Sequence, residues 1–275
     1  MELKKIFLKG IERVIGDEKE IGVALSSGKD SSIIVFALLE LGRKVTGYTF
    51  HVEGIESTDY KIAKKNSSIL GINFVECVIP KVIDANLVVS YIEKYGRFKK
   101  VDVECMYPYY FLYSKLKERI LMTGWGAGVL MPLSKKVMIH YKDDQEKYND
   151  YRKKDYVATQ KDLKVLEQVG KDMRKDVSLI DPFMTDELME YFLKLTFKET
   201  HTPHQKQPFI DMFPDMFKKT EVLNHINLQC GDSGIREIFE PLLKDGKLNP
   251  KNRTRVIDLY RDIHERGKYA EMFGG

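Results

Sequence analysis

Hydrophobic positions in the first half of the chain alternate between helical spacing and short continuous runs. Residues 2–15 carry apolar side chains at helical spacing and end at Gly16, which predicts an amphipathic helix. The run Ile21–Leu25 is apolar throughout, as expected for a parallel strand buried on both faces. The same reasoning predicts further strands over 44–52, 72–79 and 119–123, and helices over 33–41, 59–70, 82–95 and 108–116. This alternation predicts an α/β fold, a Rossmann-like parallel sheet with helices on both faces.

The pattern changes in the second half. Residues 141–176 are rich in Lys, Asp, Glu, Gln and Tyr, which predicts a mobile loop followed by a solvated helix, either an active-site lid or a charged surface connection. Helical patterning then returns over 186–198, 206–218, 233–244 and 253–266. We therefore expect an α/β domain over 1–140, a charged loop or lid over 141–176, and a helical substrate-side region over 177–275.

Composition narrows the class of protein. The 275 residues include 45 basic and 41 acidic side chains, so a net charge of +4 does not create the one-sided field of a dedicated nucleic-acid binder. The three cysteines, Cys77, Cys105 and Cys230, form no C-x-x-C pair, which favours a reducing compartment and a cytoplasmic location. We expect no signal peptide and no membrane partner, because no apolar run approaches the roughly 20 residues of a membrane span.

One polar loop between a predicted strand and a predicted helix carries the candidate chemistry. Backbone N–H groups, hydroxyls and the positive end of a helix dipole suit a phosphate chain, and the loop offers all three through Ser26, Ser27, Gly28, Lys29, Asp30, Ser31 and Ser32. A carboxylate at Asp30 would repel a polyphosphate unless Mg²⁺ lies between them, so Asp30 predicts a metal. A plain serine-rich helix cap would explain the serines but not Asp30.

This loop resembles the S-G-G-x-D-S-S loop of the PP-loop ATP-pyrophosphatases, with Ser27 where that pattern commonly has Gly. The resemblance implies ATP binding, cleavage between the α and β phosphates, and a fold of the adenine nucleotide α-hydrolase type. It also implies that the loop residues from Ser26 to Ser32 hold pyrophosphate, with Asp30 binding Mg²⁺.

Later segments are similar to the synthetase domain of the asparagine synthetase and β-lactam synthetase family. Thr123–Gly128 resembles the S-G-E-G-x-D-E turn, Ser57-Thr58-Asp59 the start of the S-D-x-x-x-A helix, and Leu179–Met184 the V-R-x-P-F-L-D stretch. Lys206 begins a segment similar to K-x-x-L-R, which implies that it stabilises charge near the α-phosphate.

Two positions depart from that family. Trp125 and Gly128 stand where the family has an acid and the aspartate of the Mg²⁺–pyrophosphate site. Either Asp30 suffices together with a nearby acid such as Asp181 or Glu53, or catalysis has been lost.

The resemblance implies an ATP-dependent ligase that forms AMP and pyrophosphate through an acyl-adenylate, with Asp30 and Lys206 as catalytic residues. Adenine recognition is expected at backbone groups of Leu25, Phe50 and Gly124, with Trp125 stacking on the base or packing in the core. The acceptor is a small molecule or a nucleobase. Since we expect no glutaminase domain, ammonia would come free or from a separate glutaminase.

Two other functions stay open. Nucleobase or tRNA thiolation uses the same loop, usually with a cysteine pair, and Cys105 and Cys230 can meet in the fold. A non-catalytic nucleotide-binding module would explain Trp125 and Gly128. The aromatic segment Tyr107–Tyr110, with Lys99 and Lys100, either lines a nucleoside or nucleic-acid site or packs on the sheet.

Overall fold

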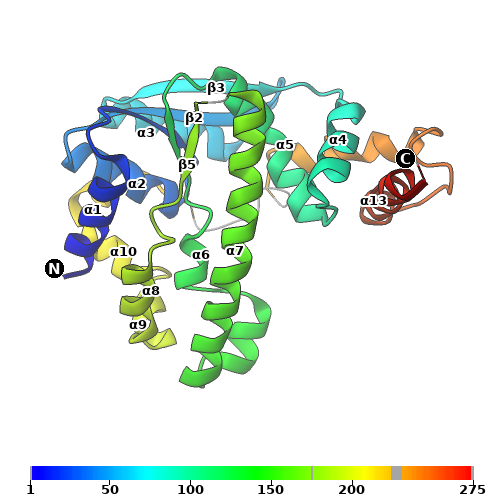
Figure 1. Ribbon diagram of the computed structural model, residues 1–275. Coiled ribbons are helices and arrows are strands. Elements are labelled where there is room, and N and C mark those ends of the chain that lie inside the picture. The colour runs from blue at the N-terminus through cyan, green and yellow to red at the C-terminus, as the bar shows by residue number, and fades with distance from the viewer. Residues whose placement is uncertain (1, 175, 224–230, 274–275) are drawn as a thin grey trace.

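The computed structural model describes residues 2–174, 176–223 and 231–273. Within this part of the chain, a sheet of five parallel strands has the order β3-β2-β1-β4-β5 (Figure 1). The strands are β1 (Glu20–Ala24), β2 (Lys44–Val52), β3 (Asn73–Ile79), β4 (Ile120–Met122) and β5 (Ser178–Ile180). The predicted fold class is confirmed.

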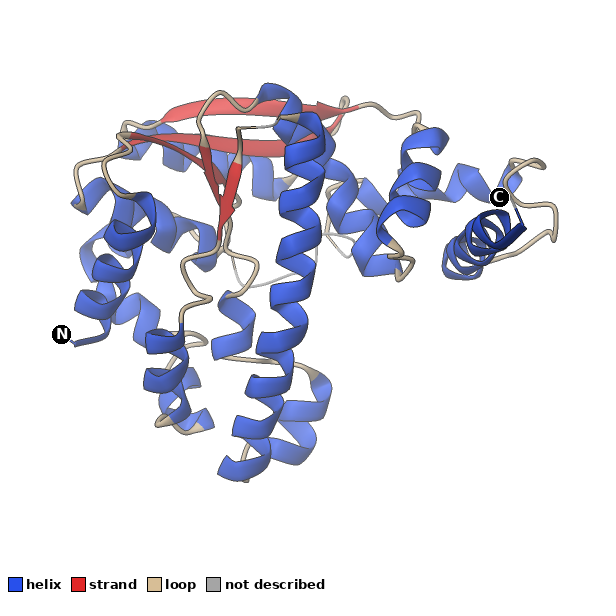
Figure 2. Cartoon of the chain, viewed as in Figure 1, coloured by secondary structure: helices blue, strands red, loops and turns tan. Residues whose placement is uncertain are grey.

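Helices connect the strands and form most of the second half of the chain, as Figure 2 shows. The first half contains α1 (Glu2–Ile15), α2 (Lys29–Glu40), α3 (Thr58–Leu70), α4 (Ala85–Tyr95), α5 (Lys100–Lys115) and α6 (Ala127–Leu130). The second half contains the π-helix η1 (Val137–Tyr141), α7 (Gln145–Met173), α8 (Asp186–Leu193), α9 (Phe197–His201), α10 (Gln207–Met212), α11 (Pro214–Lys219), α12 (Ile235–Phe239), the 3₁₀-helix η3 (Glu240–Lys244) and α13 (Val256–Phe273).

Two hydrophobic cores lie on opposite faces of the sheet. One joins α1 and α2 to α8 and α10 and contains Phe7, Phe36, Phe183 and Phe209. The other joins α4, α5 and α7 to α12 and α13 and contains Tyr48 and Tyr113. Such apolar burial is the main term that holds the layers together.

The strand order fixes where a ligand site can form. β1 pairs with β2 on one side and with β4 on the other, so successive strands extend outward in opposite directions from β1. In open parallel sheets, ligands bind at the carboxyl ends of strands where the order reverses. Here that point lies between the loop after β1 and the glycine turn after β4.

The structure differs from the sequence prediction over 141–176. Where we expected a mobile loop and then a helix, residues 145–173 form one continuous helix, α7, capped by Asp144, whose side chain accepts from the Lys147 N–H. Tyr148, Arg152, Thr159 and Leu166 are buried along one side of it. The prediction was wrong because this buried side includes an arginine and a threonine, so the aliphatic pattern is weak.

β5 was not predicted. It has only three residues, Ser178–Ile180, and pairs with β4 at the edge of the sheet. The segment 177–275 therefore begins with a strand of the main sheet, although its other described elements are helical. The proposed division into three regions stays a prediction.

Candidate functional site

The polar loop lies where β1 ends and α2 begins. Gly28 is the N-cap of α2 and has extended backbone angles, φ −72° and ψ 156°. The first amides of a helix have no intrahelical acceptor, and the helix dipole is positive at this end. The geometry therefore presents backbone donors to an anion at the carboxyl end of β1.

Serine hydroxyls close the loop on itself. The Ser26 N–H donates to Ser31 Oγ at 3.0 Å, and the two hydroxyl oxygens are also 3.0 Å apart. Ser32 Oγ donates to the Gly28 carbonyl at 2.8 Å. These hydrogen bonds hold the turn in shape before any ligand arrives.

Ser27 turns away from the start of α2 toward α3. It is fully buried, and its N–H and hydroxyl both donate to Asp59 Oδ1, at 2.8 and 2.5 Å. Asp59 lies in the first turn of α3, two residues after the N-cap Ser57. Ser27 thus anchors the loop to α3 through a charged acceptor.

Asp30 and Lys206 meet although 176 residues separate them. Lys206 Nζ lies 2.5 Å from both carboxylate oxygens of Asp30, and the two side chains are 6% and 21% exposed. Lys206 occupies the left-handed backbone region, with φ 64°, just before α10. For a residue with a Cβ this conformation is uncommon, and its surroundings must impose it. The structure therefore brings together the two residues that the sequence predicted as catalytic.

Lys29 adds a second positive charge to this region. It is half-buried, and burial together with the charge of Lys206 lowers its pKa. The ammonium groups of Lys29 and Lys206 thus lie within electrostatic range of each other, and both attract a polyanion.

The glycine turn after β4 packs against Asp30. A Cβ at Gly124 would lie 2.9 Å from Asp30 Cβ, so only glycine lets the turn approach this closely. Two residues later, the Gly126 N–H donates to Asp181 Oδ2 at 2.6 Å. Burial, and next to it the charge of Asp30, raises the pKa of Asp181 to about 7. Asp181 follows β5 and Asp30 lies in the first turn of α2, so two separate elements contribute carboxyl groups to this region.

The residues predicted to recognise adenine lie near the same edge of the sheet. The Leu25 N–H donates to the Tyr48 carbonyl at 2.9 Å. The Leu25 carbonyl accepts from Thr49 Oγ1 at 2.8 Å. A carbonyl oxygen keeps a second lone pair, which stays available to a ligand.

Phe50 and Trp125 both lie beside a third ring. Tyr109 is 6.3 Å from Phe50 and 6.4 Å from Trp125 between ring centroids, the latter edge to face. Both Phe50 and Trp125 are only partly buried, so each keeps some surface that a base can stack on. The segment 107–110 belongs to α5, and Tyr107 and Tyr109 are buried against the sheet.

Sequence reasoning missed the positions of two residues. Asp59 was noted only for its resemblance to a helix start, and its contact with Ser27 gives it a positioning role. In the sequence Tyr109 is one residue of an aromatic run, whereas in the structure its ring lies beside those of Phe50 and Trp125. Tyr109 and Tyr113 are both buried at helical spacing, which places them on one face of α5 but does not show that Tyr109 contacts Phe50 and Trp125.

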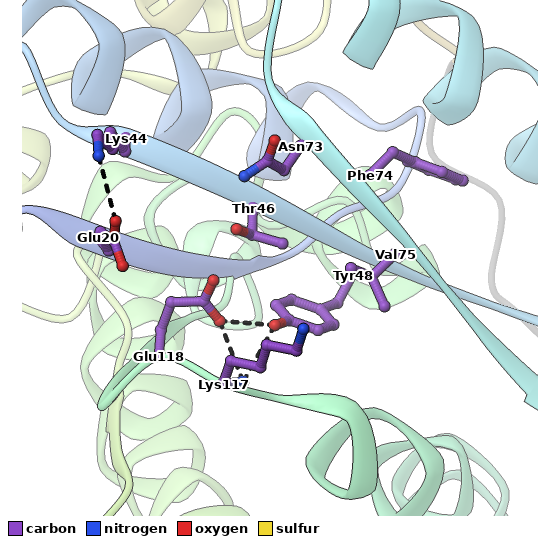
Figure 3. Close-up of a pocket in the computed structure, with 9 residues that line it drawn as sticks. All are labelled: Glu20, Lys44, Thr46, Tyr48, Asn73, Phe74, Val75, Lys117 and Glu118. Carbon is purple, nitrogen blue, oxygen red and sulfur yellow. Dashed lines mark hydrogen bonds and ion pairs between the residues drawn. The ribbon is translucent and has the colours of Figure 1, made fainter.

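A separate cavity lies at the amino ends of the strands, away from the candidate site. Its volume is about 410 Å³, and it is lined by the first residues of three strands, Glu20, Lys44 and Asn73, with Tyr48 and Glu118 (Figure 3). The Tyr48 hydroxyl donates to Glu118 Oε2 at 2.6 Å there. Because the polar loop lies at the carboxyl ends of the strands, this cavity is not part of the candidate site.

The described residues contain no cluster of three or more His, Cys, Asp or Glu side chains placed to hold a metal ion. Cys77 is buried in β3, and burial raises the pKa of its thiol to about 12. Cys230 lies outside the described residues, so the predicted meeting of Cys105 and Cys230 stays untested. No helix within the described ranges is long and apolar enough to cross a membrane.

Solved structures with a related arrangement share little sequence with this chain. A U34-tRNA thiolase, NcsA, from Methanococcus maripaludis with its 4Fe-4S cluster is 14% identical over 96% of this chain and 79% of that one, with a TM-score of 0.36. An NMN synthetase from Francisella tularensis is 13% identical over 82% of this chain and 98% of that one, with a TM-score of 0.33. A chain described as a predicted subunit of tRNA methyltransferase, from Methanocaldococcus jannaschii, is 20% identical over 64% of this chain and 75% of that one, with a TM-score of 0.33. These TM-scores are too low to bear on activity or substrate.

Comparison of the sequence with family models is more specific than comparison with solved structures. No curated protein sequence matches the chain. The family model described as asparagine synthase matches residues 2–131, a segment that contains the polar loop, Asp59 and the turn after β4. Residues 2–131, a little under half of the chain, are therefore similar to the asparagine synthase family.

Proposed function

We propose that this protein is an ATP-dependent ligase that forms AMP and pyrophosphate through an acyl-adenylate. The observation that carries the proposal is the contact between Asp30 in the PP-loop and the distant, buried Lys206. A protein that only bound nucleotide would need the loop, but not a buried ammonium held against its carboxylate. The pair supplies a metal-binding carboxylate and a cation at one point.

The first step joins the acceptor to AMP. A carboxylate oxygen of the acceptor attacks the α-phosphorus of ATP, and the bond from that phosphorus to the bridging oxygen breaks, releasing pyrophosphate. The amides at the start of α2 and the hydroxyls of Ser26 and Ser31 face the departing negative charge, and Lys206 neutralises charge near the α-phosphate. Fixed donors of this kind stabilise developing charge without reorganising.

In the second step, an amine attacks the acyl carbon, the bond to AMP breaks, and the amine loses a proton to solvent. Ammonia, free or from a separate glutaminase, is one such amine. The acceptor is a small molecule or a nucleobase with a carboxylate or amide-like oxygen.

The donor set suits Mg²⁺. Asp30 offers two hard oxygen ligands, and both already face a cation, the Lys206 ammonium. When bound, Mg²⁺ would neutralise the phosphates and favour pyrophosphate as leaving group. In that state Lys206 is free to turn from Asp30 toward the nucleotide.

The test is pyrophosphate release from ATP and Mg²⁺ with a panel of carboxylate, nucleobase and tRNA acceptors. Asp30→Ala and Lys206→Met should each lower acceptor-dependent release by about 100-fold or more, as loss of a charge-stabilising group does elsewhere. The matched control is the exposed pair Asp215 and Lys218, whose side chains are 82% and 77% exposed, as Asp215→Ala and Lys218→Met. These two should release pyrophosphate at the wild-type rate.

The outcomes separate the three functions. ATP binding with no release across the panel would replace the ligase with a nucleotide-binding module. Release that depends on tRNA and a sulfur donor, and is lost in Cys105→Ser or Cys230→Ser, would establish thiolation instead. Release that survives Asp30→Ala would overturn the assigned site.

A further inference from the structure

The turn after β4 has no carboxylate of its own. Residues 123–128 read Thr-Gly-Trp-Gly-Ala-Gly, with Trp125 and Gly128 where the asparagine synthetase pattern has acids. In the structure Trp125 packs edge to face against Tyr109. A Cβ built at Gly128 meets no atom within 4 Å, so no side chain fills the space beside it.

Asp181, which directly follows β5, contacts the turn after β4. Its Oδ2 accepts from the Gly126 N–H at 2.6 Å and its Oδ1 from the Phe183 N–H at 3.0 Å. A Cβ at Gly126 would lie 3.2 Å from Asp181 Cγ, just as one at Gly124 would lie 2.9 Å from Asp30 Cβ. The short turn 124–126 thus contacts the Cβ of Asp30 at Gly124 and the carboxyl group of Asp181 at Gly126.

Each carboxylate oxygen of Asp181 uses one lone pair on a backbone amide and keeps another. Asp30 presents both oxygens to a cation, a position that Lys206 Nζ takes in this structure. Mg²⁺ usually binds through one or two carboxylates and substrate phosphates while keeping several waters. A carboxylate one water away from the ion therefore still belongs to its site.

We propose that Asp181 is the second metal-binding carboxylate of this protein, replacing the acid that the turn after β4 has lost. The inference rests on the proposed function, since it assigns a residue to the Mg²⁺ that accompanies ATP. Glu53, the other acid considered from the sequence, is exposed at the end of β2 and has no comparable contact with the turn.

The test measures metal binding without turnover. Mn²⁺ is titrated into the full chain with a non-hydrolysable ATP analogue, and free Mn²⁺ is followed by its electron paramagnetic resonance signal. Asp181→Asn should weaken Mn²⁺ binding by about 10-fold or more, as loss of a metal-supporting carboxylate does in other proteins. Its affinity for the analogue without metal should stay within about 2-fold of wild type, because the amide oxygen keeps one of the two backbone hydrogen bonds that the carboxylate accepts. Glu53→Gln should leave Mn²⁺ binding unchanged.

A second variant separates metal binding from a purely structural role. Gly128→Asp restores an acid at the family's position, where the space is open, so Asp181→Asn with Gly128→Asp should recover most of the lost Mn²⁺ affinity. Unchanged Mn²⁺ binding in Asp181→Asn, or no recovery in the double variant, would overturn the assignment. Failure of the wild type to bind the analogue at all would instead refute the proposed function.

Discussion

Ser27 shows how one position can depart from a family pattern without loss of the loop. Where the resembling pattern commonly has glycine, the Ser27 hydroxyl reaches Asp59 at 2.5 Å, and its N–H reaches the same oxygen at 2.8 Å. Hydrogen bonds to a charged acceptor contribute more than neutral ones. The serine therefore fixes the loop to α3.

Removing this hydroxyl should destabilise the protein measurably. Ser27→Ala should lower the free energy of unfolding by about 1.5 to 3 kcal/mol, because Asp59 loses a buried donor. Urea unfolding gives the value, and Ser114→Ala, an exposed serine, should change it by less than about 0.5 kcal/mol.

A double-mutant cycle with Asp59→Asn isolates the pair. The coupling energy between positions 27 and 59 should exceed about 0.5 kcal/mol, as for residues in direct contact. Additive effects would show that the short contact contributes nothing.

The residues of the candidate site were predictable to different degrees. The loop Ser26–Ser32 is contiguous, so its chemistry is visible in the sequence alone. Lys206 was assigned only by resemblance, because no local pattern shows that a residue 176 positions away will reach Asp30. The roles of Asp59 and Tyr109 depend on contacts between elements, which spacing along the chain does not encode.

At the scale of elements, periodicity predicted most of the sheet and its connecting helices. Helix α7 was missed as a single element, since Arg152 and Thr159 stand at buried positions where the pattern expects aliphatic residues. β5 was missed because three residues are too few to show a period. Both errors fall where tertiary packing overrides local preference.

Two helical glycines in different surroundings give a test of this packing. A Cβ at Gly170 in α7 would lie 2.6 Å from the ring of Tyr113, which is fully buried, whereas one at Gly10 in α1 meets only Thr185 Cγ2 at 4.0 Å. Gly170→Ala should destabilise the protein by about 1 to 3 kcal/mol through overpacking. Gly10→Ala should stabilise it by about 0.5 to 1 kcal/mol through helix propensity.

Thermal or urea unfolding of the two variants provides the comparison. If both substitutions stabilise the protein to the same extent, α7 does not press against α5 at Tyr113, and the packing described here is wrong.

At the scale of the whole molecule, a buried acid lies where α5 meets the C-terminal helices. Glu104 is fully buried, and both of its carboxylate oxygens lack a hydrogen-bond partner among the described residues. Burial raises its pKa to about 7, while Lys100 on its own helix and Arg236 on α12 act in the opposite direction. Glu237 and Tyr260 are the other ionisable groups nearby.

This acid should make stability depend on pH. The folded state holds the Glu104 proton up to about pH 7, and the unfolded state releases it near pH 4.5, so the folded state binds more protons between these values. The contribution of Glu104 is therefore greatest below pH 4.5 and is lost as pH rises to about 7, by on the order of 3 kcal/mol in total.

Glu104→Gln provides the measurement. Urea unfolding at intervals from pH 5 to pH 8 should show the variant gaining stability relative to wild type as pH rises. The control is Glu12→Gln, an exposed residue of α1 that is not among the groups acting on Glu104, and its difference from wild type should stay nearly constant. A constant difference between Glu104→Gln and wild type would contradict the raised pKa.

The long separation between Asp30 and Lys206 also has a consequence for synthesis. On the ribosome, the loop that contains Asp30 emerges early, and the 176 residues up to Lys206 take roughly 10 to 35 seconds to translate. During that interval the nascent chain lacks Lys206, whose ammonium group later neutralises the carboxylate of Asp30. A cellular cation that occupies Asp30 in the meantime would act as a temporary substitute, and the newly made protein would then exchange it for its own lysine.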